Sequence, residues 1–501
     1  MTRSVLALYI GRLVSAGSTV VLLAVVGRLV GAEALGIVGV GMATGALLAA
    51  LTEQGASMLV VRALSHRPDR ARQIVGGLGL FRLVSLPIGL VAAYALLALL
   101  FPDHALAILL AAAWLAVQQA TELTRAVLIW AGRAGISGLH TSIENLAWVG
   151  VMTVFLLAHA PLETAFAAGL AVLVFSAFAG VVLVRLLVGW FPAMPSGQDV
   201  RQLIRDSPPF AVFVILGQLY SRVDTLLIGA LLPGGLEAAG AYFAAMRLIA
   251  GLEYLPDALT RAIYPNLARA YVAGADQAYG MIRQDPRGLR SRAATVSRAE
   301  KLRGMIRKPV ELLLWISIPV PFLAFLGADW GFPLLFGQSV VGYSWVLVAV
   351  SMFVPIRFVG YLLGIVLTTG GAQARRALAV ALAAALVVGL DVFLLPRIGL
   401  VAAVIALMTA SVTTFGIYLL QTWRSFGLPP VGRALAEALA CAGLAFVVSL
   451  ALRTVAPTGI AAPAALACFG AVYLALWMVR RSGLAMLRAG KPESRDEIGV
   501  K

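Results

Sequence analysis

Residues 5–30 read VLALYIGRLVSAGSTVVLLAVVGRLV, a run in which Arg12 is the only charged residue before Arg28. A membrane-spanning helix needs about 20 consecutive, predominantly apolar residues, because that length crosses the hydrocarbon core of a bilayer. The run is longer than the apolar region of a cleaved signal peptide, and it lacks an obvious small-residue cleavage site. It therefore predicts a first transmembrane helix.

Comparable apolar runs recur along the rest of the chain, and no soluble domain interrupts them. Hydrophobic residues make up 61% of the sequence and charged residues only 12%, whereas a soluble domain carries about 25% charged residues. The sequence thus predicts an all-α integral membrane protein with about fourteen transmembrane helices. Their expected centres are Val20, Thr44, Ile88, Trp114, Met152, Val174, Ile215, Gly251, Val320, Met352, Ala385, Met408, Leu444 and Leu466.

The basic residues gather in alternate loops. The net charge is +16, but Lys and Arg mainly follow every second expected helix, and the intervening loops hold few of them. Loops rich in Lys and Arg stay on the cytoplasmic side. We therefore expect both termini in the cytoplasm, and this distribution does not indicate a nucleic-acid partner. The basic residues concerned include Arg62, Arg67, Arg70, Arg72, Arg133, Arg201, Arg205, Arg375, Arg376, Arg424, Arg433, Arg480, Arg481 and Arg488.

The chain contains an internal repeat. The stretch Gly36–Met42 resembles Gly240–Met246, and Gly132 and Gly370 each follow a long apolar run and precede a basic loop. We expect two parallel six-helix repeats, an N-lobe and a C-lobe, followed by two further helices. Such repeats hold a substrate between them, near the middle of the membrane. The expected divisions are an N-lobe at 1–200, a C-lobe at 201–428 that includes a basic cytoplasmic loop at 273–308, two appended helices at 429–482, and a cytoplasmic tail at 483–501.

Charged residues inside the expected helices are the candidate functional residues, because a charge in the membrane is costly and usually serves a function. Arginine stays protonated and binds phosphate with two parallel hydrogen bonds, so inward-facing arginines would form a cationic cavity for an anionic substrate. The alternative is a set of buried ion pairs that hold the helices together. The candidates for this cavity are Arg12, Arg125, Arg222, Arg247 and Arg357.

Buried carboxylates are the candidates for coupling transport to a cation or proton, because burial favours the protonated form. They are Glu53, Asp224, Asp257 and Asp391. The alternative for each is an interfacial residue at a helix end. The sequence holds no pattern of an enzyme, cofactor or metal site, and Cys441 and Cys468 lie in apolar segments without the spacing of metal ligands. We expect no catalytic residue, cofactor or metal ligand.

A series of short motifs resembles the Wzx-type polysaccharide flippases, which belong to the multidrug/oligosaccharidyl-lipid/polysaccharide exporter superfamily. The resemblance covers essentially the whole chain in the expected order. Ala34-Leu35 departs from the family pattern before Gly36, and the basic loop after the eighth helix is long. The motifs are Arg28-Leu29-Val30-Gly31-Ala32-Glu33-Ala34-Leu35-Gly36, Ser221-Arg222-Val223-Asp224-Thr225-Leu226-Leu227-Ile228-Gly229, Gly240-Ala241-Tyr242-Phe243-Ala244-Ala245-Met246-Arg247-Leu248, Leu334-Leu335-Phe336-Gly337 and Gly399-Leu400-Val401-Ala402-Ala403.

The resemblance implies a flippase of the bacterial inner membrane that moves undecaprenyl-diphosphate-linked oligosaccharide for O-antigen, capsule or exopolysaccharide synthesis. A polysaccharide polymerase complex is a further expected partner beside the bilayer. Within the same fold, the alternatives are a lipid II flippase and a multidrug or cation antiporter. Outside it, the alternatives are a membrane-embedded polysaccharide polymerase or ligase, which needs a larger outer loop, and a scaffold that uses the basic loop.

Overall fold

The structure, a computed structural model, consists of helices throughout the residues that it describes. These residues are 2–53, 64, 71–189, 192–194, 208–260, 262–264, 266–267, 269, 289–369, 372–427, 431–457 and 459–489. The first group of helices is α1 (Thr2–Leu29), α2 (Ala32–Glu53), α4 (Ala71–Leu100), α5 (Ala105–Trp130), α6 (Ala134–Leu157) and α7 (Leu162–Val188).

The second group of helices includes a 3₁₀ helix and a two-residue break between α14 and α15. It comprises α9 (Pro208–Leu231), α10 (Gly235–Leu252), α12 (Leu289–Ser317), α13 (Pro319–Phe336), the 3₁₀ helix η2 (Gln338–Tyr343), α14 (Ser344–Ser351), α15 (Val354–Thr369), α16 (Gln373–Ile398) and α17 (Val401–Phe426). The last pair is α18 (Gly432–Val455) and α19 (Ala461–Ala489).

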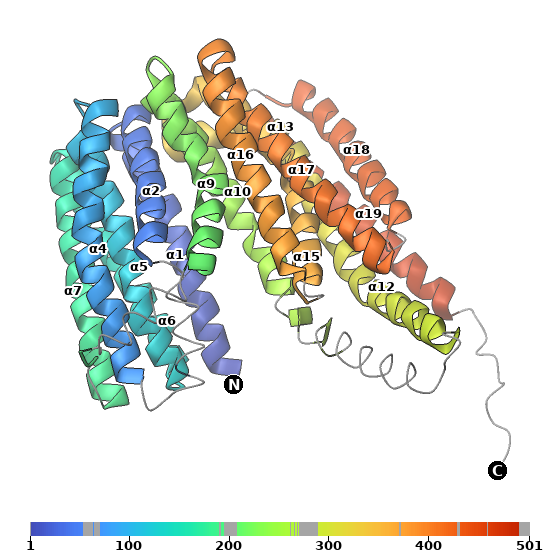
Figure 1. Cartoon of the computed structure of the whole chain (residues 1–501). Helices are drawn as coiled ribbons and strands as arrows, with labels where there is room; N and C mark the ends of the chain where they lie inside the picture. Colours follow the sequence, from blue (N-terminus) through green and yellow to red (C-terminus); the bar gives the residue numbers. More distant parts are fainter. Residues whose placement is uncertain are drawn as a thin grey trace.

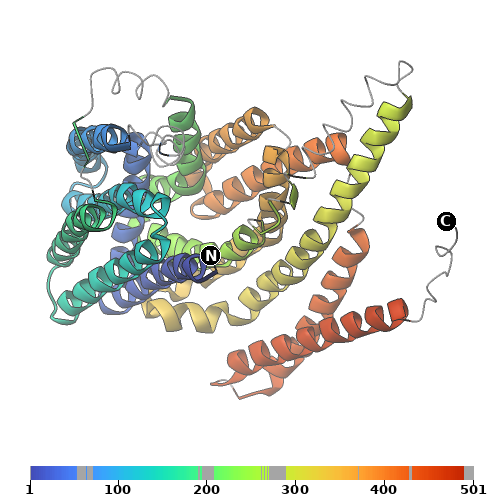
Figure 2. The same ribbon diagram turned by 90° about the horizontal axis from the view of Figure 1, so that it is seen from below.

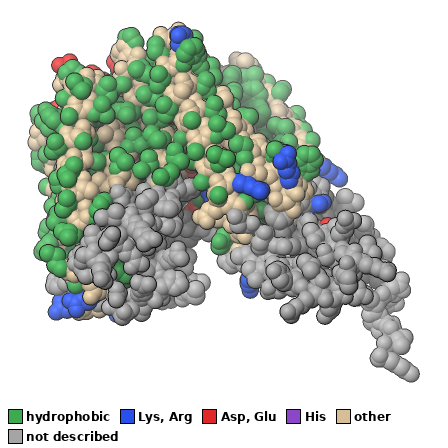
Figure 3. Space-filling model, in the orientation of Figure 1, with side chains coloured by type: hydrophobic (Ala, Val, Ile, Leu, Met, Phe, Trp, Pro, Cys, Tyr) green, Lys and Arg blue, Asp and Glu red, His purple; other side chains and the backbone are tan. Residues whose placement is uncertain are grey.

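The helices are long and apolar enough to span a membrane, and they present apolar side chains outward. On α4, Leu83, Val91 and Leu99 are 72%, 72% and 81% exposed, as expected of a surface that faces lipid tails. Figure 3 shows that green, hydrophobic side chains cover the described outer surface. The expected all-α membrane fold is therefore confirmed.

The helices that qualify as membrane spans are fewer than expected. Ten helices of the described residues meet the criteria of length and apolarity, or eleven if η2–α14 and α15 form one bent span. Every expected centre lies within a helix except Met352, which lies in the break between α14 and α15. The expected count of about fourteen is therefore not confirmed. The described part of α1, Leu13–Leu29, is among the shorter apolar helices, and Arg303–Phe336, which covers most of α12 and all of α13, counts as one span.

The two groups of helices meet at one end of the molecule and diverge toward the other. In Figure 1, α1 begins and α19 ends at the lower, divergent end. Figure 3 shows a hollow between the two groups at the same end. Seen from below in Figure 2, α18 and α19 form a separate pair along the outer side of α12 and α13. We call the two ends the closed end and the open end.

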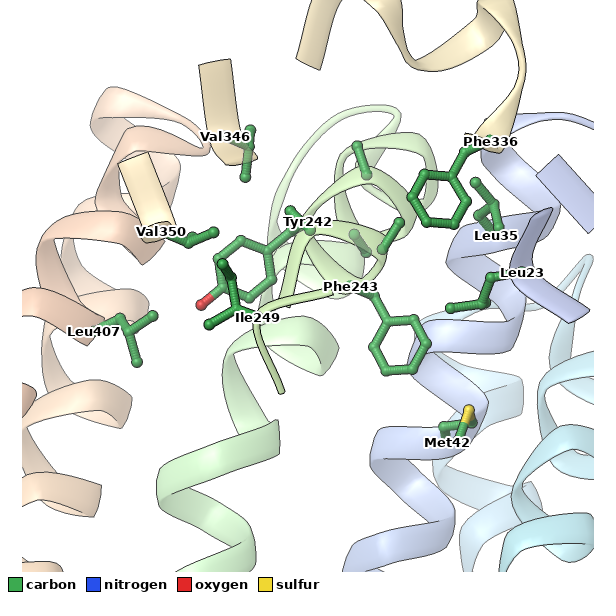
Figure 4. Packing of buried hydrophobic residues seen from close by; sticks show 14 of the residues in the cluster. Leu23, Leu35, Met42, Tyr242, Phe243, Ile249, Phe336, Val346, Val350 and Leu407 are labelled. Atoms are coloured by element: carbon green, nitrogen blue, oxygen red, sulfur yellow. The ribbon is translucent and has the colours of Figure 1, made fainter. Parts of the chain in front are cut away.

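The core joins the two groups through α10. Figure 4 shows that Tyr242 points toward Val350 and Leu407 of the second group, whereas Phe243 points toward Met42 of the first. All of these side chains belong to one buried cluster. Among membrane helices such packing stabilises through van der Waals contacts rather than through removal from water. Consecutive residues of a helix point in different directions, so one helix can pack against both groups.

The closest approach between the groups lies at the closed end, between α2 and α10. A methyl group added to Gly36 would overlap the carbonyl oxygen of Leu236, and one added to Gly240 would overlap that of Ala32. Each obstructing carbonyl lies four residues before the opposite glycine. The contact is therefore nearly symmetric, and its two glycines are the pair matched by the repeat.

One segment differs from expectation. The region 273–308 was expected to be a loop, but Leu289 begins α12, which runs on as one helix to Ser317. Its sequence LRSRAATVSRAEKLRG is rich in Ala, Arg, Leu, Glu and Lys, which have high helix propensity. The rest of the expected loop, 273–288, lies outside the described residues.

Candidate functional site

Three of the predicted arginines come together in the second group of helices. Arg222 lies on α9, Arg247 on α10 and Arg357 on α15. Arg222 lies close enough to Arg357 and Arg247 to repel both electrostatically. We call these three residues the cationic cluster.

The cationic cluster reaches the boundary between the two groups. The Nη2 atom of Arg247 donates a hydrogen bond of 3.2 Å to Oγ1 of Thr19 on α1. No described carboxylate pairs with Arg247, and Arg222 makes neither a hydrogen bond nor an ion pair among the residues described here. Because an arginine within the membrane normally has a partner, two such guanidinium groups indicate a place for an anion.

Arg357 differs from the other two because it already has a carboxylate partner. Its Nε atom lies 2.8 Å from Oε1 of Glu253, and its Nη2 atom donates a hydrogen bond of 3.1 Å to Oε2. The guanidinium also lies over the ring of Phe353, 5.3 Å from the centroid. This two-oxygen contact is the geometry in which arginine also binds phosphate.

Two of the predicted carboxylates lie deep between α9, α10 and α16. Asp224 accepts hydrogen bonds from the hydroxyl of Tyr242 and from the backbone N–H of Thr225, the latter at 2.8 Å. Asp391 is fully buried, and neither of its carboxylate oxygens has a hydrogen-bond partner in the described structure. The two carboxylates are close enough to repel each other. We call them the acid pair.

An isolated carboxylate is costly to bury, and two adjacent ones are costlier. A proton on Asp391, or a cation between the two carboxylates, would relieve both the repulsion and the missing contacts. The described residues contain no group of three or more potential metal ligands.

Arg125 lies elsewhere, inside the first group of helices. It forms an ion pair with Glu122 on its own helix and one of 2.5 Å with Glu144 on α6. The second oxygen of Glu144 accepts a hydrogen bond from Ser176 on α7, and His140 lies 3.2 Å from the same serine. These contacts join three helices, so Arg125 fits the alternative of a buried ion pair that holds helices together.

The remaining predicted residues are placed as follows. Asp257 accepts a hydrogen bond of 2.6 Å from the hydroxyl of Tyr361, one turn after the Glu253–Arg357 pair. Arg12 lies on α1 and Glu53 ends α2, but the side chains of both lie outside the described residues.

Sequence reasoning missed two residues that complete the site, and it marked a third, Glu253, only as one of the charges inside the expected helices. Tyr242 and Thr19 are neutral, so a search for charges inside helices could not find them. Glu253 is charged, but its function as a partner of Arg357 depends on a contact across 104 residues. The available signal was the matching spacing of Glu253 with Asp257 and of Arg357 with Tyr361, four residues in each case, which places both pairs on helical faces.

Taken together, the described helices define a multi-pass membrane protein, with two helical groups that meet at one end and charged side chains between them. The chain belongs to the family described as polysaccharide biosynthesis protein, which matches residues 1–271. No curated protein matches the chain in sequence.

Solved structures of transporters share the fold. The lipid II flippase MurJ in an inward closed conformation aligns with a TM-score of 0.70 and 12% identity, over 97% of this chain and 100% of that one. The MATE multidrug transporter DinF-BH aligns with a TM-score of 0.56 and 17% identity, over 85% and 95%. A MOP superfamily transporter from Pyrococcus furiosus aligns at 0.53 and 16% identity, over 84% and 95%. At these identities the likeness shows the fold alone.

Proposed function

We propose that this protein moves an undecaprenyl-diphosphate-linked oligosaccharide across the bacterial inner membrane for the synthesis of a surface polysaccharide. The observation that carries the proposal is the pair Arg222 and Arg247, two membrane-embedded guanidinium groups that form no ion pair with a described carboxylate. Asp224 and Glu253 attract Arg222 without bonding to it, and Arg247 is bonded across the boundary between the two groups. A diphosphate supplies the negative charge that such a site lacks.

The surrounding structure supports alternating access. The two groups of helices meet at the closed end and diverge at the open end, which the charge pattern predicts to be cytoplasmic (Figure 1). In this mechanism the diphosphate enters from the open end, the lipid tail stays in the bilayer, and rocking of the groups exposes the sugar at the other side. The membership of a polysaccharide biosynthesis family supports a sugar cargo.

We further propose that the acid pair, Asp224 and Asp391, binds the coupling ion. Its buried position, the unpartnered oxygens of Asp391 and the mutual repulsion support a site that holds a proton or a monovalent cation. Because the acid pair could bind a cation, it also supports the alternative that the protein is a cation antiporter. The cationic cluster favours an anionic cargo over a cationic drug, because its arginines would repel the positive charge of such a drug.

The test is mass spectrometry of polyprenyl lipids from cells depleted of this protein. We expect one undecaprenyl-diphosphate oligosaccharide to accumulate, which would also identify the sugar. Accumulation of lipid II alone would favour the lipid II flippase, which handles the same diphosphate. If no lipid accumulates and the surface polysaccharide stays intact, the proposal is overturned in favour of drug export.

A matched pair of variants tests the site. Arg222→Gln keeps a polar side chain but removes the charge, so it should fail to restore polysaccharide to depleted cells. Arg397→Gln is the control, because Arg397 is an exposed arginine at the end of α16 that bonds only within its own helix turn. Equal amounts of both variants in the membrane, with equal complementation, would contradict a substrate-binding role for Arg222.

A further inference from the structure

Two polar contacts join the segment that follows α10 to α15. Glu253 binds Arg357 through two oxygens, and Asp257 accepts a hydrogen bond from the hydroxyl of Tyr361. The members of each contact lie one helical turn from those of the other, so both contacts face the same way. We call them the latch.

The latch lies where two segments of the chain, the one after α10 and the one at the start of α15, depart from regular helix. α10 ends at Leu252, Glu253 occupies a turn, and helix resumes over residues 254–260. On the other side, α14 and α15 are separated by a two-residue break with a bend of 40° between their axes. In transporters, interrupted helices typically form the substrate site, and the breaks allow one part of a helix to move against the other.

Glu253 occupies the position that a phosphate would take. The side chains of Arg357 and Glu253 are 25% and 29% exposed, so an anion can reach the pair. Arg222 lies close enough to Glu253 to attract it and close enough to Arg357 to repel it. If Glu253 leaves, Arg357 loses its ion pair, and Asp224 remains to attract Arg222 and Arg357. Three positive charges then lie near one carboxylate, which matches a ligand with at least two negative charges.

We propose that Glu253 is an internal competitor for the substrate: its carboxylate occupies Arg357 while the site is empty, and the diphosphate displaces it. This inference rests on the function proposed above. Displacement opens the Glu253–Arg357 half of the latch and frees the end of α10 to move against α15. Binding of the correct headgroup is thereby linked to the change of conformation, since both events use the same guanidinium.

The inference predicts the direction of a binding change. In purified full-length protein in lipid nanodiscs, with undecaprenyl diphosphate as the probe, Glu253→Gln should bind about tenfold more tightly than wild type, within the usual range of such coupling. Glu253→Asp retains the charge and should stay close to wild type. Glu311→Gln is the control, because Glu311 also pairs with an arginine, Arg307, but does so within α12 and outside the latch.

A second measurement leaves Glu253 intact. Cysteines placed at Asp257 and Tyr361, in a protein whose Cys441 and Cys468 are replaced by serine, should be joined by a short bifunctional thiol cross-linker in the empty protein. The cross-linker is needed because the tyrosine hydroxyl lies too far from its own backbone for cysteines at these two positions to bond directly. Undecaprenyl diphosphate should lower the yield of this cross-link, as the segment after α10 moves away from α15. An unchanged yield at saturating probe would contradict the opening of the latch, whatever the binding of Glu253→Gln.

The outcomes separate the two proposals. If wild type binds the probe and Glu253→Gln binds it equally or more weakly, the competitor role is overturned and the proposed function stands. If wild type does not bind undecaprenyl diphosphate at all, the proposed function fails and the inference fails with it. Tighter binding by Glu253→Gln, wild-type binding by Glu253→Asp and a ligand-dependent cross-link yield support both.

Discussion

At the scale of single residues, the polar groups of the membrane interior differ in how fully they are bonded. Arg125 and Glu144 form an ion pair within the first group of helices, although the Nε atom of Arg125 has no hydrogen-bond partner there. Asp391 has no bonded oxygen among the described residues, and Arg222 has neither a hydrogen bond nor an ion pair. A membrane protein keeps such costly groups where a mobile ligand completes them. We therefore infer that a missing ion-pair partner, rather than a single unbonded atom, distinguishes the candidate functional charges from those that only hold helices together.

The Asp391→Asn variant tests the acid pair. Transport by reconstituted wild-type protein should accelerate when a proton or sodium gradient is imposed, and the variant should lose this acceleration, because an amide neither binds a proton nor attracts a cation. The protein should remain folded, since the change removes a buried charge rather than a contact. Asp103→Asn, at an exposed turn of the closed end, is the control and should respond like wild type. An unaltered gradient response in Asp391→Asn would exclude this site as the coupling site.

At the scale of elements, the pairing of α2 with α10 depends on the absence of two side chains. Gly36 and Gly240 allow each backbone to pass close to the other, and Phe243 covers Gly39 one turn further along α2. Small residues permit such close crossings of membrane helices. The closed end is therefore sensitive to the addition of a single methyl group.

We expect Gly36→Ala to weaken the closed end. The added methyl group must push α2 away from the carbonyl of Leu236, and such overpacking costs about 1–3 kcal/mol. The thermal unfolding temperature in detergent should fall, and transport should slow because one state of the cycle is disfavoured. Gly150→Ala on α6 is the control, as the space around Gly150 is open. If both variants unfold at the same temperature as wild type, the contact does not stabilise this state.

Other elements show where local sequence is an unreliable guide. The basic segment from Leu289 was expected as a loop because it is polar, but a polar segment with high helix propensity extends α12 without interruption. The apolar segment around Met352 was expected as one helix, but it divides into η2, α14 and α15. The hydropathy of a segment indicates whether it can contact lipid, but it does not indicate where a helix is interrupted.

At the scale of the whole molecule, both groups of helices and the last pair follow one topology. α1 begins and α19 ends at the open end, as an even number of crossings requires (Figure 1). The Arg- and Lys-rich loops predict that this end faces the cytoplasm. The open end would then admit a substrate that is made in the cytoplasm.

The orientation can be tested with fusions. A fluorescent protein joined to either terminus should fold and fluoresce, because we expect both termini in the cytoplasm. Alkaline phosphatase inserted at the turn 101–104 should be active, because that turn is expected in the periplasm. Active phosphatase at the C-terminus would reverse the assigned sides and, with them, the proposed direction of transport.

The sequence by itself determined the membrane class, the approximate position of the helices and the repeat that pairs Gly36 with Gly240. These properties depend on the length and polarity of continuous segments, which can be read locally. Tertiary structure decided which charges are paired. The bonds Arg357–Glu253 and Arg247–Thr19 join residues 104 and 228 positions apart, so they depend on how each helix is rotated and against which neighbour it packs. Five arginines were equivalent candidates in the sequence. Packing placed three of them in one cluster, enclosed Arg125 in ion pairs within the first group, and left the side chain of Arg12 outside the described residues.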